Sequence, residues 1–294
     1  MASSLSVPTR SRINQLLSIP SKAKKARLPW IPIVILTVLL VCAVFSPLLA
    51  PHDPENISIL DREIAPFENW TYPLGTDTLG QDMLSRLIFG ARTAMFIGMV
   101  ALGTGALVGT VLGLVAGYQG GWVDSSIMRV TDAVMGFPTI LVAMIIVSIL
   151  GAGIENIILA VAVTVWARFA RMVRGDVLGI KELDFVTAAK IAGVSTPIII
   201  ARHIFPNTVN TLMVLTSLQI GQVILLEASL SFLGLGLPVG APAWGIMVAE
   251  GRNVILNVWW LALLPGLAIT IVVLAFNFFG DWLRDRLDPK LRRA

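Results

Sequence analysis

Charged residues and cysteine are scarce in this chain. Of its 294 residues, 14% are charged and 56% are hydrophobic, and the mean hydropathy is +0.82. Soluble domains carry about 25% charged residues, so this composition indicates a protein that crosses the membrane several times. The single cysteine, Cys42, excludes an internal disulfide, and the two histidines, His52 and His203, lie far apart in the sequence. Neither histidine belongs to a metal-binding pattern.

The sequence also lacks a phosphate-binding loop of the form Gly-x-x-x-x-Gly-Lys-Ser/Thr. No nucleophile with a nearby base stands out. We therefore expect no catalytic residue, no metal site and no cofactor site in this chain. If ATP powers the protein, its nucleotide site must lie on another chain.

Six segments are candidates for membrane-spanning helices, each of which needs about 20 apolar residues. They cover residues 29–49, 93–117, 133–150, 154–169, 208–237 and 258–280. The third and fourth are separated only by residues 151–153 and are predicted to form a tight hairpin. The expected fold is all-α, with six transmembrane helices.

Positive charge predicts the orientation of these helices. Residues 1–28 hold six Lys or Arg and no acid, 166–206 hold six, and 281–294 hold five. Residues 51–92 instead hold seven acids and three arginines. Because Lys and Arg concentrate in cytoplasmic segments, both termini and the segment between the fourth and fifth spans are expected in the cytoplasm.

The expected organisation is a cytoplasmic tail at 1–28, a first transmembrane helix at 29–50 and an extracytoplasmic segment at 51–92. A core of five transmembrane helices at 93–282 and a cytoplasmic tail at 283–294 follow. An uncleaved first helix is favoured over a signal peptide, because its apolar run is longer than about 15 residues. The sequence Leu48-Leu49-Ala50 is also a poor cleavage site.

Small residues repeat in the second span, where Gly105, Gly109, Gly113 and Gly117 recur at steps of four. In lipid, such a face lets helix backbones approach closely. The glycines could pack at an interface with another subunit or against a helix of the same subunit, and we favour the second interpretation.

A polar segment at residues 184–207 interrupts the apolar pattern. Asp184 is predicted to cap a short helix that Gly193 ends in a left-handed conformation. A second short helix is predicted to begin at Ser195 or Thr196 and to be closed by Pro206. The first helix carries small residues on one face, namely Ala188, Ala189 and Ala192. This pair could insert into a partner or lie on lipid head groups.

Three other features carry polar side chains near apolar segments. Glu227 could be a gating carboxylate in a pathway or a hydrogen-bonded contact between helices, and we favour the contact. Residues 76–92 are predicted to start an amphipathic helix capped by Thr76 or Asp77, which packs on a partner or forms a docking surface. Arginines at three-residue spacing are interpreted as cytoplasmic anchors, namely Arg168, Arg171 and Arg174.

The spacing of Ala188-Ala189, Gly193 and Phe205-Pro206 resembles the "EAA" loop of ABC-importer permeases. Further blocks resemble the dipeptide/oligopeptide/nickel permease family, and specifically its C-type subunit. They begin Gly75-Thr-Asp77, Glu227-Ala-Ser-Leu-Ser231 and Ala275-Phe-Asn277. Thr187 stands where the general motif has Glu.

The resemblance implies a type I ABC-importer permease in the bacterial inner membrane, most simply for peptides. It implies a heterodimer with a homologous permease, two ATP-binding subunits that hold ATP and Mg, and an extracytoplasmic substrate-binding protein. The loop at 181–206 would be the coupling helix, and membrane lipid but no nucleic acid is expected as a further partner. The coupling residues would be Asp184, Thr187, Ala188, Ala189, Gly193 and Pro206.

Two other classes of function fit the sequence less well. An ion-driven secondary transporter would be expected to carry more ionisable groups within its spans than Glu227 alone. A membrane-embedded enzyme would need a convergent catalytic set, which the sequence does not display.

Overall fold

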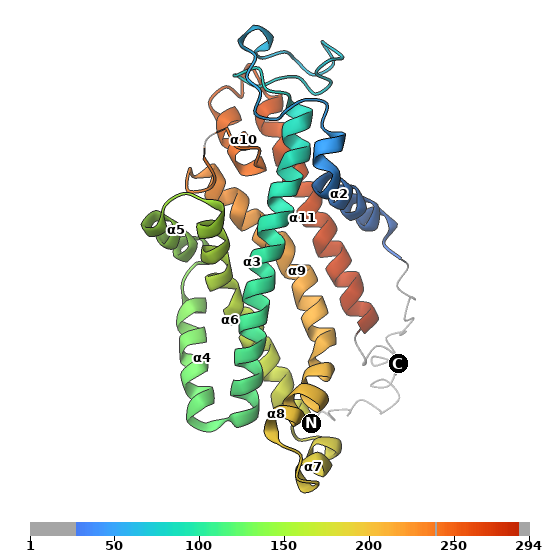
Figure 1. Cartoon of the computed structure of the whole chain (residues 1–294), viewed down its shortest axis with the longest axis vertical. Helices are drawn as coiled ribbons and strands as arrows, with labels where there is room; N and C mark the ends of the chain where they lie inside the picture. The colour runs from blue at the N-terminus through green and yellow to red at the C-terminus, as the bar shows by residue number, and fades with distance from the viewer. Residues whose placement is uncertain (1–27, 239, 288–294) are drawn as a thin grey trace, which may run out of the picture.

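A computed structural model describes residues 28–238 and 240–287, and it is almost entirely helical over them (Figure 1). Long helices run side by side along the length of the molecule, and the segment between α2 and α3 covers one end of them. The elements are α2 (Trp30–Leu49), η1 (Ile59–Asp61), α3 (Met83–Gln119), α4 (Gly121–Gly136), α5 (Thr139–Leu150), α6 (Ile154–Ile180), α7 (Asp184–Ile191), α8 (Thr196–Ile198), η2 (Ile199–Ile204), α9 (Phe205–Phe232), α10 (Trp244–Arg252) and α11 (Trp260–Leu287).

Five helical stretches of the described chain are long and apolar enough to cross a membrane: α2, α3, α6, the stretch from α8 to α9, and α11. The pair α4 and α5 adds a sixth if it counts as one bent span. The all-α, multi-pass fold expected from composition is therefore confirmed. The boundaries of several elements differ from the expected ones, and α11 for example continues to Leu287 rather than ending near residue 280.

One helix, α3, contains both the second span and most of the amphipathic helix predicted before it, and it begins at Met83. Its cap is Asp82, whose carboxylate accepts hydrogen bonds from the backbone N–H groups of Leu84 (3.3 Å) and Ser85 (3.0 Å). The prediction that Thr76 or Asp77 caps this helix is wrong, because both residues belong to the preceding loop. Asp77 instead caps a tight turn, accepting hydrogen bonds from the N–H groups of Leu79 and Gln81 at 2.8 Å each.

The expected third span, 133–150, is not one helix. α4 ends at Gly136 and α5 begins at Thr139, and the two axes are bent by 91°. Pro138 disfavours helical geometry at Phe137, which is extended (φ −102°, ψ 147°). The 12-residue α5 is only about 18 Å long, too short to cross a bilayer of about 30 Å.

The fourth span is predicted to end at residue 169, but its helix, α6, runs from Ile154 to Ile180. Arg171 and Arg174 therefore lie on the helix and not in a loop after it. α6 therefore connects the apolar region directly to the segment before α7.

Pro206 does not close a separate short helix, which corrects the prediction made for it. The chain is helical without interruption from Thr196 to Phe232, and Pro206 lies in the first turn of α9. Proline lacks an N–H and its ring clashes with the carbonyl four residues before it. The helix widens into the π-helical turn η2 just before Pro206, which accommodates the ring.

The four glycines of α3 face α6 within the same chain. A Cβ atom at Gly109 would lie 2.2 Å from the carbonyl oxygen of Trp166 and 2.6 Å from Cβ of Phe169. At Gly113 and Gly117 the nearest atoms of α6 would be 2.6 and 2.7 Å away, and at Gly105 they would be 3.2 Å away. The backbones of α3 and α6 thus approach at a distance that only glycine permits.

A buried arginine holds the segment before α3 onto the helices. Arg86 has a 1% exposed side chain that pairs with Asp77, and its Nη2 lies 2.9 Å from Oε2 of Glu250 on α10, although not aligned as a hydrogen bond. Nε1 of Trp260, the first residue of α11, donates to the carbonyl oxygen of Thr76 at 3.0 Å. These contacts join the segment to α3, α10 and α11.

Candidate functional site

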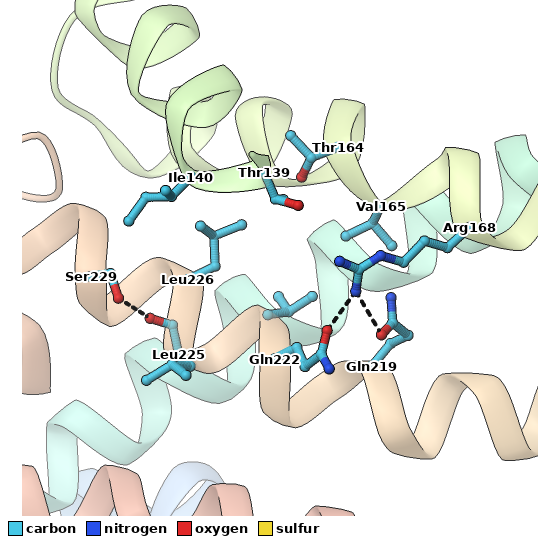
Figure 2. Close-up of a pocket in the computed structure, with 11 residues that line it drawn as sticks. Thr139, Ile140, Thr164, Val165, Arg168, Gln219, Gln222, Leu225, Leu226 and Ser229 are labelled. Carbon is cyan, nitrogen blue, oxygen red and sulfur yellow. Dashed lines mark hydrogen bonds between the residues drawn. The ribbon is translucent and has the colours of Figure 1, made fainter. Parts of the chain in front are cut away.

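A polar groove lies between α5, α6 and α9, with a volume of about 340 Å³ (Figure 2). Apolar side chains, including Val165 and Leu226, form part of its wall. Six polar side chains also line it, namely Thr139, Thr164, Arg168, Gln219, Gln222 and Ser229. Such a mixture of apolar wall and few polar groups is typical of small-molecule sites.

Arg168 and two glutamines form the most polar part of this groove. The guanidinium reaches from α6 to α9, where Nη1 donates to Oε1 of Gln219 at 3.0 Å and also to Oε1 of Gln222 (Figure 2). Arg168 lies near the middle of α6, and both glutamines lie near the middle of α9. Sequence reasoning missed both glutamines, although their spacing of three in an apolar helix was visible.

Each of the three α6 arginines interpreted as cytoplasmic anchors has a partner inside the chain, and the anchor interpretation stays a prediction. Arg171 pairs with Asp132 of α4. Nε and Nη2 of Arg174 donate to the two carboxylate oxygens of Asp124 on α4, at 2.6 and 2.7 Å. The two acids belong to α4, so they fasten α4 to α6, whereas Arg168 faces the groove.

Glu227 does not line the groove. Its side chain is 1% exposed, and the hydroxyl of Ser231, one turn later on α9, donates to its Oε1 at 2.8 Å. The described partner is therefore on the same helix rather than on a neighbouring helix. Neither the gating nor the contact interpretation is decided by this arrangement, and both stay predictions.

The loop at 184–207 has the expected turn but a different start. Leu183, not Asp184, is the N-cap of α7, and Asp184 lies in the first turn without a side-chain capping bond. At the other end Gly193 has φ +77°, and its N–H donates to the carbonyl of Lys190 at 3.0 Å. The N–H of Val194 donates to the carbonyl of Ala189 at 3.1 Å, which completes a Schellman motif.

The small-residue face expected on α7 is divided between two sides of the helix. Ala189 and Val186 are buried, and they belong to an apolar cluster with residues of α3 and α6, including Val173 and Val177. Ala188, Ala192 and Thr187 are exposed. Ala189 is thus part of the internal packing, which corrects its expected place on a partner surface. Large apolar side chains of this loop and of the residue before it are exposed as well, namely Leu183, Phe185, Ile191 and Ile198.

Polar contacts link the C-terminal end of α6 and this loop to the C-terminal end of α3. Nζ of Lys181 donates to the carbonyl of Gly117 at 3.0 Å, and Nζ of Lys190 lies 5.6 Å from the ring centroid of Tyr118. The same loop continues through η2 into α9 without a break. The loop is therefore joined to α3 and α6 by packing and to α9 by the helix itself, and α6 and α9 carry the polar groove.

Comparison with known proteins agrees with this architecture. The chain is 41% identical to the dipeptide transport system permease protein DppC of Alkalihalophilus pseudofirmus, over 92% of this chain and 88% of that protein. It is 42% identical to the glutathione transport system permease protein GsiD of Pectobacterium atrosepticum, over 87% and 84%.

A solved amino acid ABC transporter crystallised with histidines shares the fold. Its TM-score is 0.53 at 15% identity, over 69% of this chain and 94% of that chain. Residues 109–293 match the family described as binding-protein-dependent transport system inner membrane component. The resemblance found in the sequence is confirmed, and the chain belongs to this family, the permeases of ABC importers.

Proposed function

We propose that this permease imports peptides and forms half of their translocation pathway. Relatives at 41% and 42% identity are named for dipeptide and glutathione transport, and glutathione is itself a small peptide. The other half of the pathway would be a homologous permease, and an extracytoplasmic binding protein would deliver the peptide. Both termini lie in the cytoplasm in this proposal, as the distribution of Lys and Arg predicts.

The chain would be a non-catalytic subunit. Its sequence has no phosphate-binding loop, so ATP and Mg would be held by two partner ATPase subunits. The protein would couple their motion to transport through the loop at 184–207.

One observation carries this proposal: the loop is attached to both helices that bear the groove. The buried cluster joins it to α3 and α6, Lys190 lies over the ring of Tyr118 at the end of α3, and the unbroken helix joins it to α9. A displacement of the loop by an ATPase would therefore tilt these helices as rigid bodies and open or close the groove between them.

Docking would depend on shape and apolar contact. Thr187 occupies the position of the acid in the general motif and is exposed, so it offers no charge for an ion pair. Beside it are exposed Ala188 and the apolar side chain of Ile191, which is 83% exposed. An apolar ridge of this kind fits a groove on a partner subunit.

The test is to purify the permease with its partner subunits and compare Ala188→Asp with Asn69→Asp. Ala188 is exposed on α7, so a charge there should leave the fold intact and reduce ATPase co-purification and ATP-driven peptide uptake by about tenfold or more. Asn69 is exposed at the other end, and its side-chain oxygen accepts from the N–H of Thr71, a bond that Asp retains. This control should keep its ATPase. Peptide uptake by the permease alone, without ATPase subunits, would refute the proposal.

A further inference from the structure

We propose that Arg168 recognises the carboxylate of a peptide in transit, with Gln219 and Gln222 holding the guanidinium between transport events. This inference rests on the proposed function, because it assigns a chemical group of the substrate to the polar groove. It concerns passage through the permease and is separate from recognition by the binding protein.

Arg168 has no carboxylate beside it in the described part of the chain, in contrast to the two arginines that follow it on α6. Arg171 and Arg174, on the same helix, each pair with an acid of α4. Among the described residues, no carboxylate lies within 4 Å of Arg168. Arg168 lies near the middle of the 27-residue α6 rather than at its end, and charged residues that face the interior of a helix bundle usually mark a pathway.

Within the described residues, the guanidinium of Arg168 is hydrogen-bonded along one edge only. Both hydrogen bonds to the glutamines come from Nη1, and the described chain provides no partner for Nε or Nη2. Arginine presents its donors in a planar fork that matches the two oxygens of a carboxylate. One edge of Arg168 is therefore held in place while another is left for a ligand.

The rest of the groove wall is partly apolar and partly polar. It combines apolar side chains such as Ile140, Val165 and Leu226 with the small hydroxyls of Thr139 and Ser229. A wall of this kind accepts many side chains without selecting one. Peptides of different sequence share a C-terminal carboxylate and an N-terminal ammonium group, and of these two the carboxylate is the one that an arginine binds, so a single arginine suits this class of solute.

The glutamines also explain how the ligand would leave. A translocation site must bind strongly enough to admit the solute and weakly enough to release it. Because Gln219 and Gln222 are neutral acceptors that bind Nη1, they keep the guanidinium hydrogen-bonded when the carboxylate departs from its other edge. The guanidinium is then never left without a partner in the groove.

The experiment uses the complete transporter in proteoliposomes with saturating, loaded binding protein. A dipeptide with a free C-terminus is compared with the same dipeptide carrying a C-terminal amide, after binding of each to the binding protein has been measured separately. Arg168→Gln should lower ATP-driven uptake of the free-carboxylate peptide by about tenfold or more, as expected for a lost charged hydrogen bond. Uptake of the amide should change less than about twofold.

Two further variants keep the result interpretable. Arg168→Lys retains the charge without the planar fork and should give an intermediate loss for the free peptide only. Arg171→Gln removes a neighbouring arginine that has its own carboxylate and should affect both peptides alike. An equal loss of both peptides in Arg168→Gln, in a complex that assembles normally, would overturn the inference. Failure of the wild-type complex to import either peptide would instead refute the proposed function.

Discussion

The close contact of α3 with α6 makes Gly109 the most crowded of the four glycines along this contact, and a single added methyl group there should be costly. In Gly109→Ala the new Cβ would lie 2.2 Å from the carbonyl oxygen of Trp166, 2.6 Å from Cβ of Phe169 and 3.0 Å from the backbone nitrogen of Ala170. None of these atoms is the end of a flexible side chain, so the helices must separate by about 1 Å to restore a normal carbon–oxygen contact.

The expected magnitude follows from two opposing effects. Overpacking of this kind costs about 1–3 kcal/mol, and the upper part of that range applies because backbone atoms must move. Replacing glycine by alanine inside a helix returns about 1 kcal/mol. The net loss should be about 1–2 kcal/mol, which lowers the ratio of folded to unfolded protein about 5- to 30-fold.

The matched control is Gly103→Ala on the same helix, because a Cβ at Gly103 meets no atom within 4 Å. This variant should be neutral or more stable by up to about 1 kcal/mol. Unfolding by SDS in mixed micelles, followed by tryptophan fluorescence, compares the two variants with the wild type. Equal stability of Gly109→Ala and Gly103→Ala would refute the view that α3 and α6 are in contact through their backbones.

Two predictions concern the segment before α3. Arg86→Met should destabilise the protein by about 3–5 kcal/mol, because it leaves buried carboxylate charge unpaired, and should speed proteolysis within residues 51–82. Arg62→Met removes only an exposed hydrogen bond from Nε to the carbonyl of Thr78 and should have a smaller effect, and equal proteolysis of the two variants would contradict the role of the buried pair. Trp260→Phe should cost about 1–3 kcal/mol because it removes the hydrogen bond to the carbonyl of Thr76. Thermal unfolding should show a smaller change for Trp259→Phe, whose ring is 48% exposed, and the reverse order would contradict the bond's importance.

Features that depend on local chemistry were predictable from the sequence. Apolar length predicted α2 almost to the residue, since a helix in lipid must satisfy its backbone internally over about 20 residues. Gly193 was expected in a left-handed conformation because glycine has no Cβ to oppose it, and its φ is +77°. The order of motifs was sufficient to identify the family.

Features that depend on neighbours were not predictable. Helical spacing showed that Ala188 and Ala189 are adjacent, but only the packing of α7 against α3 and α6 decided that Ala189 is buried and Ala188 exposed. The sequence shows Pro138, which disfavours helix at the residue before it, but the 91° angle between α4 and α5 depends on how these helices pack.

The sequence by itself determined that this protein is a multi-pass permease, because hydropathy, charge asymmetry and motif spacing are properties of the chain order. Only the tertiary structure decided what its polar side chains do. Arg168 and Gln219 are 51 residues apart in the sequence, and no periodicity relates them. The packing of α6 beside α9 places them in one groove, where a charge that resembled a cytoplasmic anchor becomes the proposed contact for a transported carboxylate.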